Sequence, residues 1–250
     1  MEFIDCHCHI SDNVFFKEID AHLLEWKKIG IKIIGSMATN FKTSVRNIEL
    51  AKKYPDLVKV GIGRHPWGAH KFDEKEQLLF EELFQKNNFD IIGEIGLDHY
   101  FIKEEEKYSQ QKLVFEYFLG KANETKKPIM IHLTGAENKI ADILTTYKLS
   151  SNLCCHWFSG EKSILKRLID LNCYFSINPA FLRSKNHQQV IELVEVTRLL
   201  PESDGPVKFM DKIGSPSLMP IIYEKLAEKL KLRIEKLSEI LLTNFQNYLF

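Results

Sequence analysis

Residues 128–133 read Pro-Ile-Met-Ile-His-Leu, a short apolar run that begins at a proline and carries a histidine near its far end. Apolar residues in unbroken succession, without alternation with polar ones, are typical of a parallel strand that is covered on both faces. Runs of the same kind recur along the whole chain. The expected strands span residues 2–6, 32–37, 58–62, 90–95, 128–133, 152–157, 173–177 and 198–202. The sequence therefore predicts eight buried parallel strands.

The segments between these runs predict crossover helices. The runs start about 21 to 38 residues apart, which is the length of one strand followed by one helix. One apolar stripe at helical spacing extends from Leu113 to Ala122, and another extends from Ile164 to Leu171. Two more helical stretches, residues 218–230 and 234–250, follow the last strand. We expect the second of these to pack the C-terminus onto the strands.

Eight strand–helix units predict an α/β fold, a closed (β/α)8 or TIM barrel. A length of 250 residues also allows two small domains, but the sequence contains no linker and no low-complexity tract. We therefore expect a single domain over residues 1–250. In such a barrel the carboxyl ends of all strands meet on one face, where active sites are built.

Composition and charge exclude several classes of protein. The 34 Lys and Arg residues balance 34 Asp and Glu residues, so the chain lacks the positive charge with which a protein coats DNA. The first residues show no secretory signal, and no apolar run reaches the length of a membrane span. The five cysteines are an odd number in apolar segments, which favours buried thiols over disulfides. These features predict a cytoplasmic protein without a membrane partner.

Histidines gather at the predicted strand ends. Five of the nine stand at or just past the end of a strand: His7, His9, His65, His132 and His156. A single histidine in such a place is more often an ordinary core or loop residue. Because a barrel brings all strand ends to one face, we expect these imidazoles to meet at one site.

Two carboxylates are expected at the same site. Glu94 lies near the end of the strand 90–95, and Asp204 follows the strand 198–202. A buried carboxylate without a partner is costly, and a metal cation removes that cost. One catalytic zinc usually takes three protein ligands, but the candidates number six: His7, His9, Glu94, His132, His156 and Asp204. The sequence therefore predicts two divalent ions with a bridging carboxylate, and it leaves Zn, Mn, Mg and Fe open as the metal.

The order of these motifs resembles a known family, the TatD-type metal-dependent deoxyribonucleases of the amidohydrolase superfamily. The motifs that carry the resemblance are His7-x-His9, Gly63-x-His65-Pro66, Gly93 to Asp98, Pro128 to His132, His156 to Gly160 and Ser203 to Pro206. They cover essentially the whole chain. The resemblance implies His7, His9, Glu94 and Asp204 around one ion and Glu94, His132 and His156 around the other.

The same resemblance implies a hydrolase that cuts phosphodiester bonds of DNA, as an exonuclease, through a water activated by two metal ions. The implied partner is DNA, either single-stranded or at its ends. In this sequence Arg64 and Trp67 stand where the family pattern has an apolar residue and a second histidine. These two departures concern the substrate-facing side of the site and leave the six candidate ligands in place.

Further residues are expected to act on water or substrate. Glu94 and Asp204 are the catalytic carboxylates, and Asp204 is expected to accept the proton of the attacking water. His65 is expected to hold a phosphate oxygen or to support a ligand, and Asp98 to orient a neighbour or to contact substrate. Candidates for phosphate contacts and base stacking are Arg64, Lys103, Arg183, Lys185, Trp67, Tyr100, Phe101, Trp157 and Phe158, with core packing favoured for Phe158.

Two alternatives stay open at this point. The same scaffold supports hydrolysis of a small ester, lactone or phosphoester, because a fold alone does not choose the substrate. The second alternative is a non-catalytic barrel that keeps its metal ligands for stability or for binding a partner. No obligate protein partner is indicated, and a monomer is the default expectation.

Overall fold

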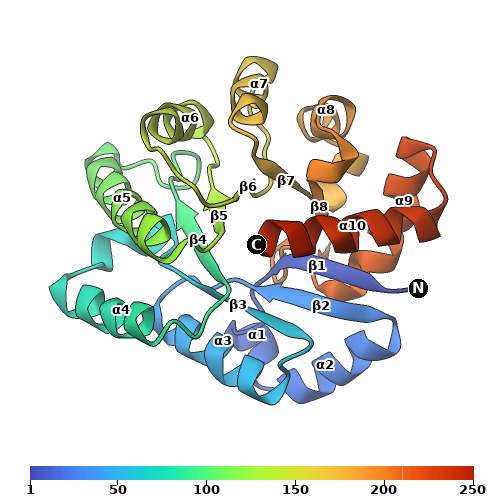
Figure 1. Cartoon of the computed structure of the whole chain (residues 1–250), viewed down its shortest axis with the longest axis horizontal. Helices are drawn as coiled ribbons and strands as arrows, with labels where there is room; N and C mark the ends of the chain where they lie inside the picture. The colour runs from blue at the N-terminus through green and yellow to red at the C-terminus, as the bar shows by residue number, and fades with distance from the viewer. Residues whose placement is uncertain (210) are drawn as a thin grey trace.

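Eight parallel strands form the centre of the molecule. The computed structural model describes residues 1–209 and 211–250. The strands lie side by side in chain order, and Figure 1 shows them surrounded by helices. Their bounds are β1 Phe3–Cys8, β2 Ile31–Ser36, β3 Val58–Ile62, β4 Ile91–Gly96, β5 Ile129–His132, β6 Leu153–Cys155, β7 Tyr174–Ile177 and β8 Leu199–Pro201. The prediction of a TIM barrel is confirmed, and each strand ends within about two residues of its expected bounds.

The first strand meets the segment after the last strand and so closes the barrel. Each strand from β1 to β7 pairs in parallel with the next one. The backbone N–H of Asp204 donates to the carbonyl of His7 at 3.0 Å, and that of His9 donates to the carbonyl of Gly205 at 2.7 Å. These two hydrogen bonds place His7, His9 and Asp204 beside one another.

Helices cover the outside of the strands (Figure 1). Their bounds are α1 Asn13–Phe16, α2 Ile19–Lys28, α3 Phe41–Lys53, α4 Glu74–Lys86, α5 Tyr108–Thr125, α6 Glu137–Thr146, α7 Lys162–Asp170, α8 Lys185–Leu193, α9 Met219–Leu230 and α10 Ile234–Leu249. A short hairpin, β9 Lys208–Phe209 with β10 Lys212–Ile213, precedes the last two helices. The C-terminal helix α10 packs onto the strands as expected, where Asn244 Nδ2 donates to the carbonyl of Leu199 at 2.9 Å.

The core confirms most of the expected apolar stripe on α5. Val114, Phe118 and Ala122 are buried, but Leu113, which the stripe included, is 61% exposed. Each residue of a helix is rotated by about 100° from the one before it, so a run of consecutive apolar residues cannot all face the core. All five cysteines are buried and free, as expected.

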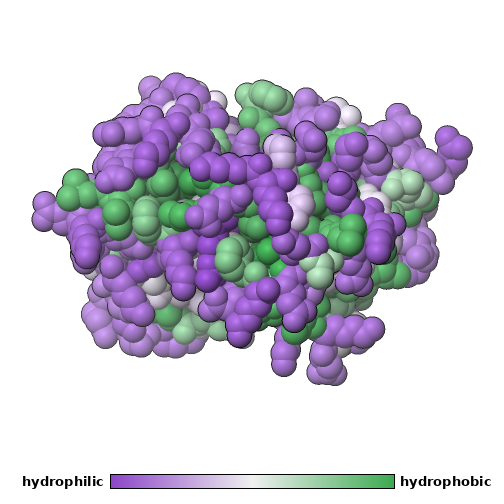
Figure 2. Space-filling model, turned by 90° about the horizontal axis from the view of Figure 1, so that it is seen from below, coloured by the Kyte–Doolittle hydropathy of each residue, from purple (hydrophilic) through white to green (hydrophobic). Residues whose placement is uncertain are grey.

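One face of the molecule is covered mostly by polar side chains. Figure 2 shows one face of the molecule, on which hydrophilic side chains cover most of the area and hydrophobic ones form small groups between them. Exposed apolar side chains in such small groups are normal for a folded protein. Among the residues that the structure describes, no helix is both long enough and apolar enough to cross a membrane.

Candidate metal centre

Six side chains named from the sequence converge at the carboxyl ends of the strands. Their positions are His7 in β1, His9 just after β1, Glu94 in β4, His132 at the end of β5, His156 just after β6 and Asp204 after β8. Glu94 is 1% exposed and His7 is fully buried. The structure therefore brings together side chains from five different strands.

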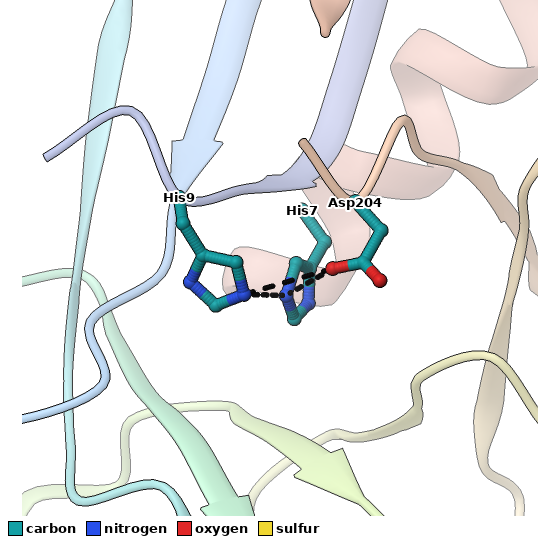
Figure 3. Close-up of side chains that lie close together, drawn as sticks. All are labelled: His7, His9 and Asp204. Atoms are coloured by element: carbon teal, nitrogen blue, oxygen red, sulfur yellow. Dashed lines mark hydrogen bonds and ion pairs between the residues drawn. The ribbon is translucent and has the colours of Figure 1, made fainter. Parts of the chain in front are cut away.

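One group of four ligand atoms surrounds a single point. The Nε2 atoms of His7 and His9 are 3.2 Å apart. Glu94 Oε2 lies 3.4 Å from His7 Nε2 and 3.3 Å from His9 Nε2. Asp204 Oδ1 lies 3.4 Å and 3.6 Å from the same two nitrogen atoms (Figure 3). A tetrahedral ion with bonds of about 2.1 Å has ligand atoms about 3.4 Å apart, so this group fits a divalent cation.

The other carboxylate oxygen of Glu94 faces a second group of histidines. Glu94 Oε1 is 2.8 Å from His132 Nδ1 and 3.7 Å from His156 Nε2. His156 Nε2 is also 3.8 Å from Asp204 Oδ1. The two oxygens of one carboxylate thus face two different sets of nitrogen atoms. This arrangement suits a carboxylate that bridges two metal ions.

Hydrogen bonds select the nitrogen atom with which His132 and His156 can bind a metal. His132 Nε2 lies 2.9 Å from Asp98 Oδ2, and His156 Nδ1 lies 2.8 Å from Glu202 Oε2. A carboxylate only accepts hydrogen bonds, so each of these nitrogen atoms carries a proton. The nitrogen atoms that remain for a metal are His132 Nδ1 and His156 Nε2, and both face Glu94. A carboxylate behind the imidazole is typical of metal-binding histidines.

His9 and His65 present opposite groups to the centre. His9 Nδ1 must donate to the carbonyl of Met37 at 3.1 Å, which leaves Nε2 as its metal-binding atom. His65 Nδ1 instead accepts the backbone N–H of Trp67 at 3.2 Å. Burial lowers the pKa of His65 to about 3, so the ring is neutral and its one proton is at Nε2. His65 therefore offers a donor, 3.6 Å from Glu94 Oε1, and not a lone pair for a metal.

Opposite charges hold the centre in an ionised form. Burial disfavours the charge on Glu94, but the neighbouring histidines outweigh it and hold the pKa of this carboxyl well below its usual range. For His9, burial is outweighed by hydrogen bonds to Asp204 and Glu94, which raises its pKa to about 10. The same balance, with Glu202 as the main partner, raises the pKa of His156 to about 9. Without a metal, these imidazoles hold protons that a bound ion must displace.

Sequence patterns gave no role in the site to Asp5 or Glu202. Asp5 is completely buried and accepts hydrogen bonds from the hydroxyl and backbone N–H of Ser203 and from the backbone N–H of His7. It therefore ties β1 to the segment after β8, and burial raises its pKa to about 8. Glu202, also fully buried, holds the ring of His156. The available signal was an acidic residue inside an apolar strand, a placement that is costly without partners.

A cavity of about 780 Å³ opens onto these ligands. The residues at its bottom, here named the floor, are His9, His65, Glu94, His132, His156 and Asp204. Trp67, Tyr100 and Phe101 also line the cavity but are 47%, 58% and 61% exposed, and they are here named the rim. The volume lies within the range of sites that bind small molecules and cofactors.

Arg183, expected as a substrate contact, is not among the residues that line the cavity. Arg183 is exposed and follows a 3-10 turn, Pro179–Leu182, in which Phe181 is buried. Lys103 and Lys185 are likewise exposed and outside the cavity lining. Among the described residues that line the cavity, the lysine and arginine side chains are Arg64 and Lys71. The sequence did not predict Lys71.

Asp98 orients its neighbours and has no exposed surface for substrate. Its side chain is fully buried, and Oδ2 accepts hydrogen bonds from His132 and from the indole N–H of Trp67. Its Oδ1 accepts the backbone N–H groups of Tyr100 and Phe101. Burial alone would raise the pKa of Asp98, but these hydrogen bonds outweigh it and hold the pKa below its usual range. Of the two roles expected for Asp98, the structure supports the orienting one.

Arg64 and Phe158 are both largely buried. Arg64 lines the cavity, yet its Nε donates to the carbonyl of Gly68 at 2.9 Å and its Nη1 lies 3.4 Å from Glu76 Oε1. A guanidinium held in this way adds positive charge to the wall and keeps several of its five N–H donors free. Phe158 is fully buried, in agreement with the core packing favoured for it.

Comparisons with known protein sequences identify the family of this chain. The family described as TatD related DNase matches residues 4–249. An uncharacterised metal-dependent hydrolase of Mycoplasma genitalium is 33% identical over 261 aligned positions, which cover 98% of this chain and 97% of the relative. Deoxyribonuclease TATDN3 of Homo sapiens is 23% identical, over 96% of this chain and 92% of its own length.

The fold has a match among solved structures as well. A TatD homologue from Escherichia coli superposes with a TM-score of 0.90 at 23% sequence identity, and the match covers 98% of this chain and 97% of that chain. The family match extends over nearly the whole chain and includes every strand of the barrel. The chain therefore belongs to the TatD-related DNase family and is a metal-dependent hydrolase.

Proposed function

We propose that this hydrolase is a deoxyribonuclease that cleaves phosphodiester bonds with the help of two divalent metal ions. The placement of Glu94 carries the proposal, because its two carboxylate oxygens face two separate sets of ligand atoms. The residues that would hold the ions are His7, His9, Glu94 and Asp204 for one and Glu94, His132 and His156 for the other. When bound, the ions would activate a water and neutralise charge on the phosphoryl oxygens.

Asp204 is the group that accepts the proton of the attacking water. Its carboxylate lines the cavity, and neighbouring histidines outweigh burial and hold its pKa below the usual range, so it is ionised at neutral pH. Its backbone has a φ of 50°, a conformation that is unfavourable for a residue with a Cβ and is concentrated at functional sites. An ionised carboxylate beside the water is suited to act as a general base.

His65 donates a hydrogen bond to the substrate. Its Nε2 carries the proton, and its ring lines the cavity between Glu94 and Trp67. A donor aimed at a non-bridging phosphate oxygen stabilises the charge that grows there in the transition state. Lys71, on the wall of the same cavity, adds a positive charge for the phosphate backbone.

The proposed substrate is a single DNA strand or the end of a duplex, processed as by an exonuclease. The ligand atoms lie at the bottom of a cavity, which a strand end enters more easily than the continuous backbone of a duplex. A relative named deoxyribonuclease, TATDN3, supports DNA as the substrate. We also propose that residues 1–250 form one domain that acts as a monomer in the cytoplasm, where free buried cysteines are stable. The donor set is compatible with Zn, Mn, Mg or Fe.

A gel time course tests the proposal. Single-stranded DNA labelled at one end is incubated with the purified protein and Mn²⁺ or Mg²⁺, with EDTA as the control. We expect stepwise shortening that requires the metal, is lost in Glu94→Gln and is retained in Glu228→Gln, which changes an exposed side chain on α9. Intact DNA from a folded, metal-loaded protein would contradict the proposal and would favour a small ester, lactone or phosphoester.

A further inference from the structure

A second cavity, of about 380 Å³, lies between helices α5 and α6 and is here named the α5–α6 pocket (Figure 1). Among the described residues, none lines both this pocket and the cavity over the metal centre. Its volume is large enough for a small molecule. The apolar side chains of its wall are Leu97, Tyr108 and Ile143, and the cationic ones are Lys112 and Lys139.

The wall of this pocket contains an imidazole with an unpaired nitrogen atom. His99 lies on the connection after β4, and its Nε2 is buried without a hydrogen-bond partner among the residues that the structure describes. The ring is held in place, because it stacks on Tyr108 with centroids 3.6 Å apart, and the Tyr108 hydroxyl donates to the carbonyl of Ile102 at 3.2 Å. Buried polar atoms are nearly always hydrogen-bonded, so an unpaired one at a cavity wall points to a partner from outside the chain.

Lys139 places a positive charge beside this imidazole. Its Nζ lies 5.4 Å from the centre of the Tyr108 ring, on which His99 is stacked. Burial and the charge of Lys139 lower the pKa of His99, so the ring is neutral at pH 7. A neutral imidazole carries one N–H donor, which can bond to the oxygen of a ligand. A cation and a donor therefore stand close together on one wall of the pocket.

The other charged groups of the wall have partners within the protein. Lys112 Nζ lies 3.7 Å from Glu116 Oε1, and Asp142 Oδ1 lies 2.7 Å from Arg167 Nη2. Within the part of the chain that the structure describes, Lys139 has no such ion pair, so it is the charge of the pocket that lacks a counter-charge. An anion therefore complements the wall better than a cation or a neutral molecule.

We propose that the α5–α6 pocket is a second binding site, which takes a small organic acid with a carboxylate attached to an apolar body of the size of a benzene ring. The carboxylate contacts Lys139 and accepts the N–H of His99, and a charge-assisted bond of this kind is stronger than a neutral one. The apolar body covers Leu97 and Ile143, which removes their surface from water. The inference does not depend on the proposed nuclease function. The pocket nevertheless lies close to the metal centre along the chain, since His99 directly follows Asp98, which holds His132.

The test observes the pocket itself, by NMR of the zinc-loaded protein labelled with ¹³C at the δ1 methyl groups of isoleucine. The signal of Ile143 is assigned by its loss in Ile143→Val. Titration with benzoate should shift this signal, with a dissociation constant of about 1 mM for a ligand of this size. Ile221, which is exposed on α9 and lines neither cavity, gives the reference signal. Benzoate that binds only at the metal centre would leave the Ile143 signal in place and would overturn the proposal.

Two control ligands separate the charge from the apolar body. Benzamide has the same ring without the charge, and inorganic phosphate has the charge without the ring. We expect each to bind about tenfold more weakly than benzoate. Equal affinity for benzoate and benzamide, or for benzoate and phosphate, would overturn the proposed ligand class.

Two variants test the residues that hold the carboxylate. Lys139→Gln removes an exposed charge, and His99→Phe keeps a ring that can stack on Tyr108 but removes both nitrogen atoms. We expect the dissociation constant of benzoate to rise about fivefold in the first and about tenfold in the second. Lys166→Gln, which changes an exposed lysine on α7 outside both cavities, should leave it unchanged. An affinity for benzoate that Lys139→Gln and His99→Phe leave as it is in Lys166→Gln would overturn the proposal.

Discussion

The floor and the rim of the cavity are built in different ways. The floor residues lie on strands or directly after them, and hydrogen bonds to buried partners such as Glu202 and Asp98 fix their rings. The rim residues lie on the connections after β3 and β4 and keep about half of their surface in water. Strands in a closed barrel keep their spacing, whereas the loops above them vary without disturbing it. The difference indicates that catalytic chemistry and substrate choice are separable in this fold.

The largest expected effect comes from the bridge in the floor. Glu94→Gln keeps the shape of the side chain but removes the charge that faces both groups of ligand atoms. We expect the rate of DNA hydrolysis to fall by about 10³-fold or more, with an unchanged circular dichroism spectrum. Metal analysis after dialysis should show a loss of bound ion. Near wild-type turnover in this variant would rule out Glu94 as the bridge.

The next largest effect, on metal affinity, should come from Asp98 and Glu202, which hold the rings of His132 and His156. In Asp98→Asn, the amide oxygen stays with the two backbone N–H groups, so its NH₂ faces the Nε2–H of His132. We expect metal affinity to fall about 10- to 100-fold, and similarly in Glu202→Gln through His156. Competition with a fluorescent zinc chelator measures the change. Asp142→Asn, an exposed position on α6, serves as the control, and an equal loss there would contradict the assignment.

A change of one pH unit should shift the affinity of the floor for metal by a factor in the same range. The pKa of His9 is raised to about 10 and that of His156 to about 9. Without a metal, the protons on these two rings therefore stabilise the folded state at a pH below the pKa of histidine in the unfolded chain. This stabilisation is lost as the pH rises through 9 to 10. A metal ion displaces these protons, so its affinity should rise about tenfold per pH unit for each proton released. Titration calorimetry at pH 7 in two buffers of different ionisation enthalpy measures this release. Identical heats in both buffers would show that no proton leaves.

The smallest effect should come from the link between rim and floor. Trp67→Phe keeps an aromatic ring but removes the N–H that donates to Asp98. We expect the KM for single-stranded DNA to rise only about threefold and zinc affinity to fall less than in Asp98→Asn. Steady-state kinetics and chelator competition on the same preparation measure both. A KM change as large as that of Phe101→Ala would show that the indole itself is required.

The strands and the convergence of the six ligands could be predicted because both follow from local patterns and one rule of topology. Apolar runs such as residues 128–133 mark the strands, and a parallel barrel brings their carboxyl ends together. His132 and His156 needed no knowledge of their neighbours to be placed there. The nitrogen atom with which each histidine can bind a metal could not be predicted in this way. It depends on Asp98 and Glu202, which contact the two histidines only in the folded chain.

The residues that were placed wrongly depend on side-chain direction within loops and helices. Arg183 follows a predicted strand, but its side chain is exposed and does not line the cavity. Leu113 belongs to an apolar run on α5, but the turn of the helix directs it to solvent. Asp5 was given no role because its partner Ser203 lies near the other end of the chain. Helical spacing could have excluded Leu113 from the stripe, but it contains no information about Arg183 or about the partner of Asp5.

The closure of the barrel has a consequence for protein synthesis. The hydrogen bonds between His7 and Asp204 and between His9 and Gly205 join the start of the chain to a segment near its end. During translation, His7 and His9 leave the ribosome long before Asp204 is made. A nascent or truncated chain therefore lacks both the last ligand of the first group and the proposed proton acceptor. We expect a hydrolase built in this way to stay inactive until most of its length has been synthesised and folded.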